Sequence, residues 1–136
     1  MRRSLLDTNV YIDWLNDGLR EDIVVGPGRL RILSAVVLME LRAGATTRAA
    51  VNAVDALFRT YSRAQRLTAP NPTLYEEAGR VLLHLRKDGR EVRRASLVAD
   101  ALIALTARSL GATVVTKDGG DFAAIRKHCE FALEVV

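Results

Sequence analysis

The chain has 136 residues, of which 49% are hydrophobic, and its 20 basic and 16 acidic residues give a formal net charge of +4. This length suits one domain, which we expect to span residues 1–136. The hydrophobic content excludes an unfolded chain, and a single cysteine, Cys129, excludes a disulfide framework or a cysteine-built zinc site. No apolar stretch approaches the ~20 residues of a membrane span. Asp7 interrupts the only segment that resembles a signal peptide, so we expect a cytoplasmic protein with no membrane partner.

The basic residues are almost all arginine, since only Lys87, Lys117 and Lys127 are lysines. Arginine pairs with phosphate through two hydrogen bonds at once, so this composition favours a nucleic-acid partner. A general compositional bias would produce the same excess, and the charge alone therefore leaves the question open.

In chain order, residues 4–6 form a short apolar run that predicts a buried strand ending at Asp7. Helical spacing follows over residues 8–16, and Gly26-Pro27-Gly28 predicts a turn. Residues 30–33 predict a second strand. Ser34 is a suitable cap for the next helix, which Gly44 ends.

The second half continues the same alternation. An amphipathic helix is predicted over residues 46–61, a short strand near 66–68 and a helix over 73–86. A strongly apolar helix over 97–110 precedes a β-branched strand at 113–115, a turn at 118–121, a short helix from Phe122 and a last strand within 131–136. Short apolar strands separated by helices predict an α/β fold, with a central parallel sheet and helices on both faces.

Two acidic residues lie in unexpectedly apolar surroundings. Glu40 and Asp100 each follow apolar neighbours along a predicted helix, with no basic residue three or four positions away. A desolvated carboxylate costs several kcal/mol unless it is paired, protonated or bound to a cation. Each could pair with an arginine from elsewhere in the chain, or bind a metal.

Asp7 and Asp118 each follow a predicted strand. Asp7 is also a suitable helix cap, and Asp118 and Asp121 suit the turn around Gly119-Gly120. In a parallel sheet, however, ligands bind outside the carboxyl ends of the strands. Carboxylates that converge there repel one another unless a divalent cation neutralises them, and oxygen-only ligands suit Mg²⁺ or Mn²⁺. An acidic pocket on a basic protein indicates metal-assisted phosphodiester cleavage.

Four segments in this order resemble a family: LLDTNV at 5–10, SAVVLMELRAG at 34–44, DALIA at 100–104 and TKDGGDF at 116–122. Together they are similar to the PIN-domain ribonucleases, and more narrowly to the VapC toxins of toxin–antitoxin pairs. The resemblance covers nearly the whole chain. It implies an α/β/α sandwich that cleaves structured RNA, such as transfer or ribosomal RNA, with Mg²⁺ or Mn²⁺.

The resemblance also implies roles for individual residues. Asp7, Glu40 and Asp100 match the metal-binding acids and Asp118 the more variable fourth, which Asp121 could assist or replace. The polar positions that brace carboxylates or hold water are matched by Thr8, Asn9, Ser34 and Thr116. The implied partners are an RNA substrate, a second copy of the chain in a homodimer, and a VapB-type antitoxin whose C-terminal segment covers the groove.

On this basis Asp7 and Asp100 hold the metal, while Glu40 and Asp118 bind it directly or through water, and either of the latter could be the general base. A basic cluster before the Asp100 helix is our candidate for phosphate contact, and it comprises Arg86, Lys87, Arg90, Arg93 and Arg94. A solvated loop with no function would have the same composition.

Two other classes of function remain open. An aspartyl-phosphate phosphatase needs a second Asp two residues after the first, where this chain has Asn9, and a receiver needs paired acids that the first strand lacks. A non-catalytic PIN-like module that binds RNA or protein would not need all four acids.

Overall fold

Five parallel strands form one sheet in the order β3-β2-β1-β4-β5. The structure is a computed structural model and describes residues 1–136. The strands are β1 (Arg2–Leu6), β2 (Arg29–Ser34), β3 (Leu67–Thr68), β4 (Thr113–Thr116) and β5 (Ala132–Val135). The helices are α1 (Thr8–Asp17), α2 (Glu21–Val24), α3 (Ala35–Gly44), α4 (Arg48–Arg63), α5 (Pro72–Lys87), α6 (Ala95–Ser109) and α7 (Gly120–Arg126).

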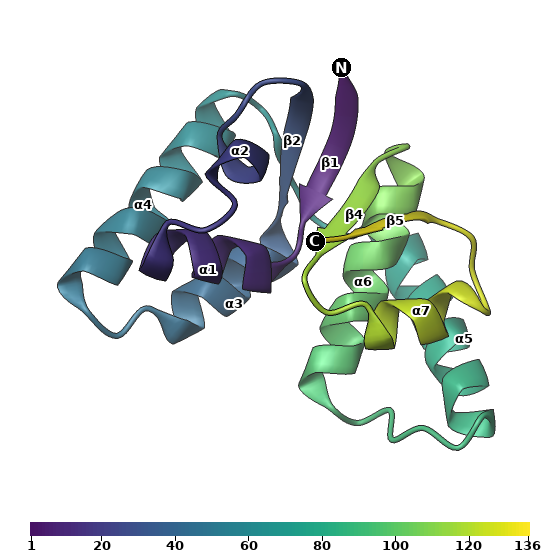
Figure 1. The fold of residues 1–136 in the computed structure, drawn as a ribbon. Helices are drawn as coiled ribbons and strands as arrows, with labels where there is room; N and C mark the ends of the chain where they lie inside the picture. The colour runs from purple at the N-terminus through teal and green to yellow at the C-terminus, as the bar shows by residue number, and fades with distance from the viewer.

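The helices cover both faces of the sheet. Figure 1 shows α1 to α4 on one side and α5 to α7 on the other, with β1 between them. The chain passes from β1 outward to β3 and then returns to β4 on the opposite side of β1, so the direction of strand addition reverses between β1 and β4. The predicted three-layer α/β/α architecture is confirmed, and ligands of such sheets bind at this reversal point.

Side-chain caps set where several helices begin, as the sequence indicated for Asp7 and Ser34. The hydroxyl of Ser34 accepts a hydrogen bond from the Val36 backbone N–H (3.1 Å) and starts α3. Thr47 and Asn71 cap α4 and α5 in the same way. Gly18 ends α1 with a φ of 66°, a left-handed conformation that glycine adopts without strain.

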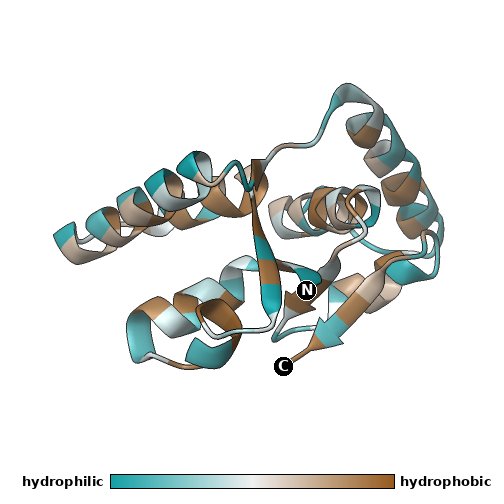
Figure 2. Cartoon of the chain, turned by 90° about the horizontal axis from the view of Figure 1, so that it is seen from above, coloured by the Kyte–Doolittle hydropathy of each residue, from teal (hydrophilic) through white to brown (hydrophobic).

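The core is aliphatic and lies on both faces of the central strands. Leu5, Leu6 and Val114 in the sheet are fully buried, and so are Ile103 and Ala104 of α6. Figure 2 shows apolar and polar residues interspersed along the helices. Helix α6 differs from an amphipathic surface helix because every residue from Ala101 to Ala107 is buried. No helix of this structure has both the length and the apolar character needed to cross a membrane.

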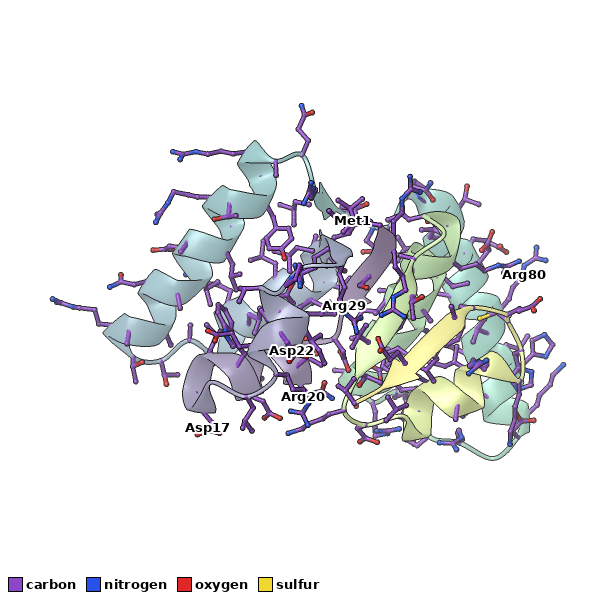
Figure 3. The ribbon with its side chains drawn as sticks, turned by 45° about the horizontal axis from the view of Figure 1, so that its top comes forward. Met1, Asp17, Arg20, Asp22, Arg29 and Arg80 are labelled. Atoms are coloured by element: carbon purple, nitrogen blue, oxygen red, sulfur yellow. The ribbon has the colours of Figure 1, made fainter.

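One ion pair joins strands that are not neighbours in the sheet. Arg29, at the start of β2, donates to both carboxylate oxygens of Glu134 on β5 at 2.7 and 3.0 Å. Figure 3 shows Arg29 near the middle of the molecule. The guanidinium holds the pKa of Glu134 below its usual range, and the pair secures the C-terminal edge strand.

The predicted elements are all present, with ends that differ by a few residues. Helix α2 was not predicted, because a four-residue helix is too short to show a helical period. Arg20 precedes α2 with a left-handed φ of 57°. The predicted turn at Gly26-Pro27-Gly28 lies in the loop between α2 and β2, where the Arg31 guanidinium donates to the carbonyls of Ile23 and Gly26.

Candidate active site

Asp7 lies at the carboxyl end of β1 and is 7% exposed. Its backbone N–H continues the sheet by donating to the carbonyl of Val115 on β4 (2.8 Å), and its side chain accepts from the Thr8 N–H (2.8 Å). Burial raises the pKa of Asp7, hydrogen bonds from Thr116 and Thr8 lower it, and the charges of Glu40 and Asp118 raise it. Asp7 is therefore both the predicted helix cap and a buried acid next to other carboxylates.

The hydroxyl of Thr116 fixes the second oxygen of Asp7. Thr116 ends β4, is fully buried and donates to Asp7 Oδ2 at 2.8 Å. Its oxygen accepts from the Asn9 side-chain amide and from the Asp118 N–H, both at 3.2 Å. One hydroxyl thus links the ends of β1 and β4, as expected for residues that orient a ligating carboxylate.

Glu40 reaches the same edge of the sheet from the second turn of α3. Its Oε1 accepts a hydrogen bond from the Thr8 hydroxyl (2.8 Å), and no arginine or lysine lies within ion-pair distance. Thr8, which follows Asp7, therefore connects Glu40 to the end of β1. The sequence left open an ion pair with a distant arginine, and the structure contains none.

Asp100, in the second turn of α6, has neither an ion pair nor a hydrogen-bond partner for its carboxylate. Burial, followed by the charges of Asp7, Asp121 and Glu40, raises the pKa of Asp100 to about 8, against a smaller opposing effect of Arg94. The ionised form of this carboxyl group therefore has no cationic partner that would stabilise it at neutral pH.

The two acids of the loop after β4 have different surroundings. Asp118 is exposed and accepts only the Gly120 N–H (3.2 Å) through its side chain. Asp121, the second residue of α7, pairs with two arginines: Arg94 at 3.1 Å and Arg90 at 3.4 Å. Asp118 is therefore the acid of this loop that remains free of a cationic partner.

These side chains line one polar cavity of about 310 Å³ at the carboxyl edge of β1 and β4. Its lining consists of five acids with a few polar neighbours, one arginine and one apolar residue: Asp7, Thr8, Asn9, Ile12, Glu40, Arg94, Ser96, Asp100, Asp118 and Asp121. The structure thus brings together every acid that the sequence singled out, from four separate segments of the chain.

The donor set fits a hard divalent cation. The cavity offers carboxylate and hydroxyl oxygens, without histidine or cysteine, which suits Mg²⁺ or Mn²⁺. Burial and, after it, the charges of the neighbouring carboxylates raise the pKa of Asp100, and a bound cation would relieve that repulsion. As the side chains stand, no three of them converge closely enough to hold one ion, so a bound cation would contact one or two carboxylates directly and the others through water.

Ser34 differs from the other predicted supporting residues. Thr8, Asn9 and Thr116 contact the acids or one another, whereas the Ser34 hydroxyl is used to cap α3. Ile12 and Ser96 also line the cavity and were not predicted as site residues. Helical spacing could have found both, because each lies four residues from a predicted site residue, Thr8 or Asp100.

The predicted basic cluster is exposed and extends from the end of α5 through the loop to α6. Arg90 and Arg94 contact the acidic cavity through Asp121. Arg93 pairs with Glu91 (3.3 Å), while Arg86 has no acidic partner. A neighbouring cavity of about 330 Å³ is lined by Arg86, Arg90, Glu91, Val92 and Arg93.

The fold and the site define a class of protein: a parallel α/β sandwich with an acidic cavity where the strand order reverses. Within that class, the chain belongs to the PIN-domain family, whose model matches residues 4–128. No curated protein sequence matches the chain.

Solved structures similar to this one include three toxin–antitoxin systems. DNA-bound VapBC from Salmonella typhimurium has a TM-score of 0.72 at 25% identity and covers 99% of this chain and 98% of its own. VapBC-5 from Mycobacterium tuberculosis has a TM-score of 0.61 at 26% identity, and the match covers 100% of this chain and 98% of that one. VapBC-1 from nontypeable Haemophilus influenzae has a TM-score of 0.70 at 22% identity, and the match covers 98% of this chain and 97% of that one. At this identity the match shows a similar fold. These neighbours support the resemblance to VapC-type toxins.

Proposed function

We propose that this protein is a Mg²⁺- or Mn²⁺-dependent endoribonuclease and the toxin of a toxin–antitoxin pair, acting in the cytoplasm on structured RNA such as transfer or ribosomal RNA. The observation that carries the proposal is the convergence of Asp7, Glu40, Asp100 and Asp118 on one cavity. Membership of the PIN-domain family and the VapBC neighbours support it.

The carboxylates have separable roles in this proposal. Asp7 and Asp100 hold the cation, because burial raises the pKa of both carboxyl groups and a bound cation would offset that cost. When bound, the cation polarises the phosphate and makes water a stronger nucleophile. Glu40 or Asp118 binds the cation directly or through water, or accepts the proton of the water that attacks the phosphate in line.

The hydroxyl groups position these acids. Thr116 holds Asp7 Oδ2, the Thr8 N–H holds Asp7 Oδ1, and the Thr8 hydroxyl holds Glu40 Oε1. Glu40 therefore keeps Oε2 for the cavity, and Asp7 keeps the remaining lone pairs of its two oxygens. Asn9 in turn donates to Thr116, which fixes the direction of its single hydroxyl proton. Such bracing keeps ligands in place before substrate arrives.

The basic cluster supplies the RNA contact. Its five residues, Arg86, Lys87, Arg90, Arg93 and Arg94, are exposed and lie in and beside the α5–α6 loop. The cavity lined by Arg86, Arg90 and Arg93 lies beside the acidic one, since Arg90 also pairs with Asp121. A phosphate next to the cleaved bond can therefore meet arginine while that bond faces the acids.

A VapB-type antitoxin and a homodimeric assembly belong to the same proposal. An apolar cavity of about 250 Å³ between α1, α3 and α4 shares Ile12 and Glu40 with the acidic one. A peptide with apolar residues followed by an arginine would fit both. Expression of the chain alone should arrest growth, and co-expression of the antitoxin should relieve the arrest.

Cleavage of structured RNA tests the function. The purified protein should cut with Mg²⁺ or Mn²⁺ and not with a chelator, whereas Asp7→Asn and Asp100→Asn should lose at least about 100-fold in rate. Asp17→Asn, an exposed acid of α1 outside the cavity, is the matched control. A folded Asp100→Asn variant that cuts at the wild-type rate would falsify the proposal.

A further inference from the structure

We propose that Arg94 binds the phosphate that is cleaved, and that Asp121 positions Arg94 for this role and is not itself a metal ligand. This inference rests on the proposed RNA cleavage and assigns two residues of that site. It separates Asp121 from Asp118, which lies three residues earlier in the chain and lines the same cavity.

The contacts of Arg94 place its guanidinium at the edge of the acidic cavity. One nitrogen donates to both oxygens of Asp121 at 3.1 and 3.2 Å, and the other donates to the Ser96 hydroxyl at 3.1 Å. Arg94 is the basic residue that lines the cavity, and its charge lowers the pKa of Asp100. The arginine is thus held beside the acids without pairing with Asp7, Glu40, Asp100 or Asp118.

Asp121 is already neutralised. Besides Arg94 it pairs with Arg90 at 3.4 Å, so one carboxylate lies between two guanidinium groups. A ligand of a divalent cation must give up such partners or bring positive charge next to the ion. Asp118, which has no arginine or lysine partner, meets neither obstacle.

The Arg94–Asp121 pair can open when a phosphate arrives. The Arg94 side chain is 47% exposed and that of Asp121 is 24% exposed, and ion pairs this accessible add little to stability. A guanidinium binds phosphate oxygens through two parallel hydrogen bonds, which lysine cannot reproduce. The first turn of α6, which contains Ser96, has no side-chain cap, so its backbone N–H groups also favour an anion here.

The test compares Arg94→Gln, Arg94→Lys and Asp121→Asn with Asp118→Asn, and uses Arg80→Gln as the control. Arg80 lies on α5, pairs only with Glu76 and extends into solvent (Figure 3). Mn²⁺ affinity is measured by calorimetry on the RNA-free protein, and kcat and KM are measured for RNA cleavage. Circular dichroism confirms that each variant is folded.

We expect Arg94→Gln to lose about 100-fold in kcat/KM and Arg94→Lys to recover only part of it. Asp121→Asn should lose about tenfold, and the double variant should be no worse than Arg94→Gln, because Asp121 acts through Arg94. None of these should change Mn²⁺ affinity more than about twofold, whereas Asp118→Asn should weaken it about tenfold or more.

Two results would overturn the inference. Weakened Mn²⁺ binding in Asp121→Asn would make Asp121 a metal ligand, and faster cleavage with tighter Mn²⁺ binding in Arg94→Gln would make Arg94 an inhibitory plug. If the wild-type protein cuts no RNA, the proposed function fails, and the Mn²⁺ affinities of the Asp118 and Asp121 variants still decide whether Asp121 is a ligand.

Discussion

At the scale of single residues, Asp100 shows what the crowded carboxylates do to the free protein. Its pKa is about 8 in the folded state, against 3.8 for an unperturbed aspartate. Between these values the folded state binds more protons than the unfolded one, so the free energy of unfolding contributed by Asp100 falls as pH rises. The stabilising effect of its proton is complete only below about pH 4 and is lost by about pH 8.

We therefore predict that Asp100→Asn raises the Tm of the metal-free protein at pH 8 by about 5 °C or more, since 1 kcal/mol is worth several degrees in a chain of this size. The gain should shrink as pH falls toward 4. Differential scanning calorimetry in chelator measures this, with Asp17→Asn as the control. A gain that is equal at pH 5 and pH 8 would show that the charge of Asp100 is not the cause.

The second prediction for a single residue concerns the contribution of the Thr116 hydroxyl to the free energy of unfolding. Replacing Thr116 with valine preserves the shape of the side chain but removes the hydroxyl that links Asp7, Asn9 and Asp118, and such losses cost about 1–3 kcal/mol. Urea unfolding should show this loss, and Thr116→Ser should restore part of it. Thr113→Val on the same strand, where no side-chain hydrogen bond is made, should be nearly neutral. Equal stability of the two valine variants would contradict the role of the hydroxyl.

The sequence was enough to predict that the acids lie together, but not to decide whether Asp118 or Asp121 is the fourth acid of the site. Asp118 and Asp121 share one glycine turn, and nothing local distinguishes them. The difference comes from Arg94 and Arg90, which are 27 and 31 residues away along the chain. Only the folding of the α5–α6 loop against α7 brings these charges to Asp121 and leaves Asp118 without them.

At the scale of elements, the sequence indicated the cap of α3, Ser34, but not the caps of α4 and α5, Thr47 and Asn71. Ser34, Thr47 and Asn71 start α3, α4 and α5 in the structure, because a side-chain oxygen there accepts a backbone N–H that the helix leaves free. The short helix α2 follows a left-handed Arg20 and has no side-chain cap, so no capping residue marks its start in the sequence. Its place depends on the tertiary contacts of Arg31.

The caps of α3 and α4 provide a matched pair of variants. Ser34→Ala and Thr47→Ala should each lower the free energy of unfolding by about 1 kcal/mol. Only Ser34→Ala should also weaken Mn²⁺ binding, because α3 carries Glu40 and α4 carries no residue of the acidic cavity. Urea unfolding and calorimetry check the two effects. Unchanged Mn²⁺ affinity in Ser34→Ala would mean that the start of α3 does not position Glu40.

At the scale of the whole molecule, the net charge of +4 conceals two opposed regions. The acids of the cavity lie at one edge of the sheet, and the arginines of the α5–α6 loop lie beside them. A phosphate backbone is attracted by the second region and repelled by the first unless a cation is bound there. The parallel sheet makes this contrast possible, because it collects residues from distant segments at one edge.

Binding of Mn²⁺ to the RNA-free protein, measured by isothermal titration calorimetry, tests most directly that these carboxylates form a divalent metal site. Wild-type protein and Asp17→Asn should bind Mn²⁺, whereas Asp7→Asn and Asp100→Asn should bind at least about tenfold more weakly. Folded Asp7→Asn and Asp100→Asn variants that bind Mn²⁺ as tightly as the wild type, or a wild-type protein that binds none, would contradict it.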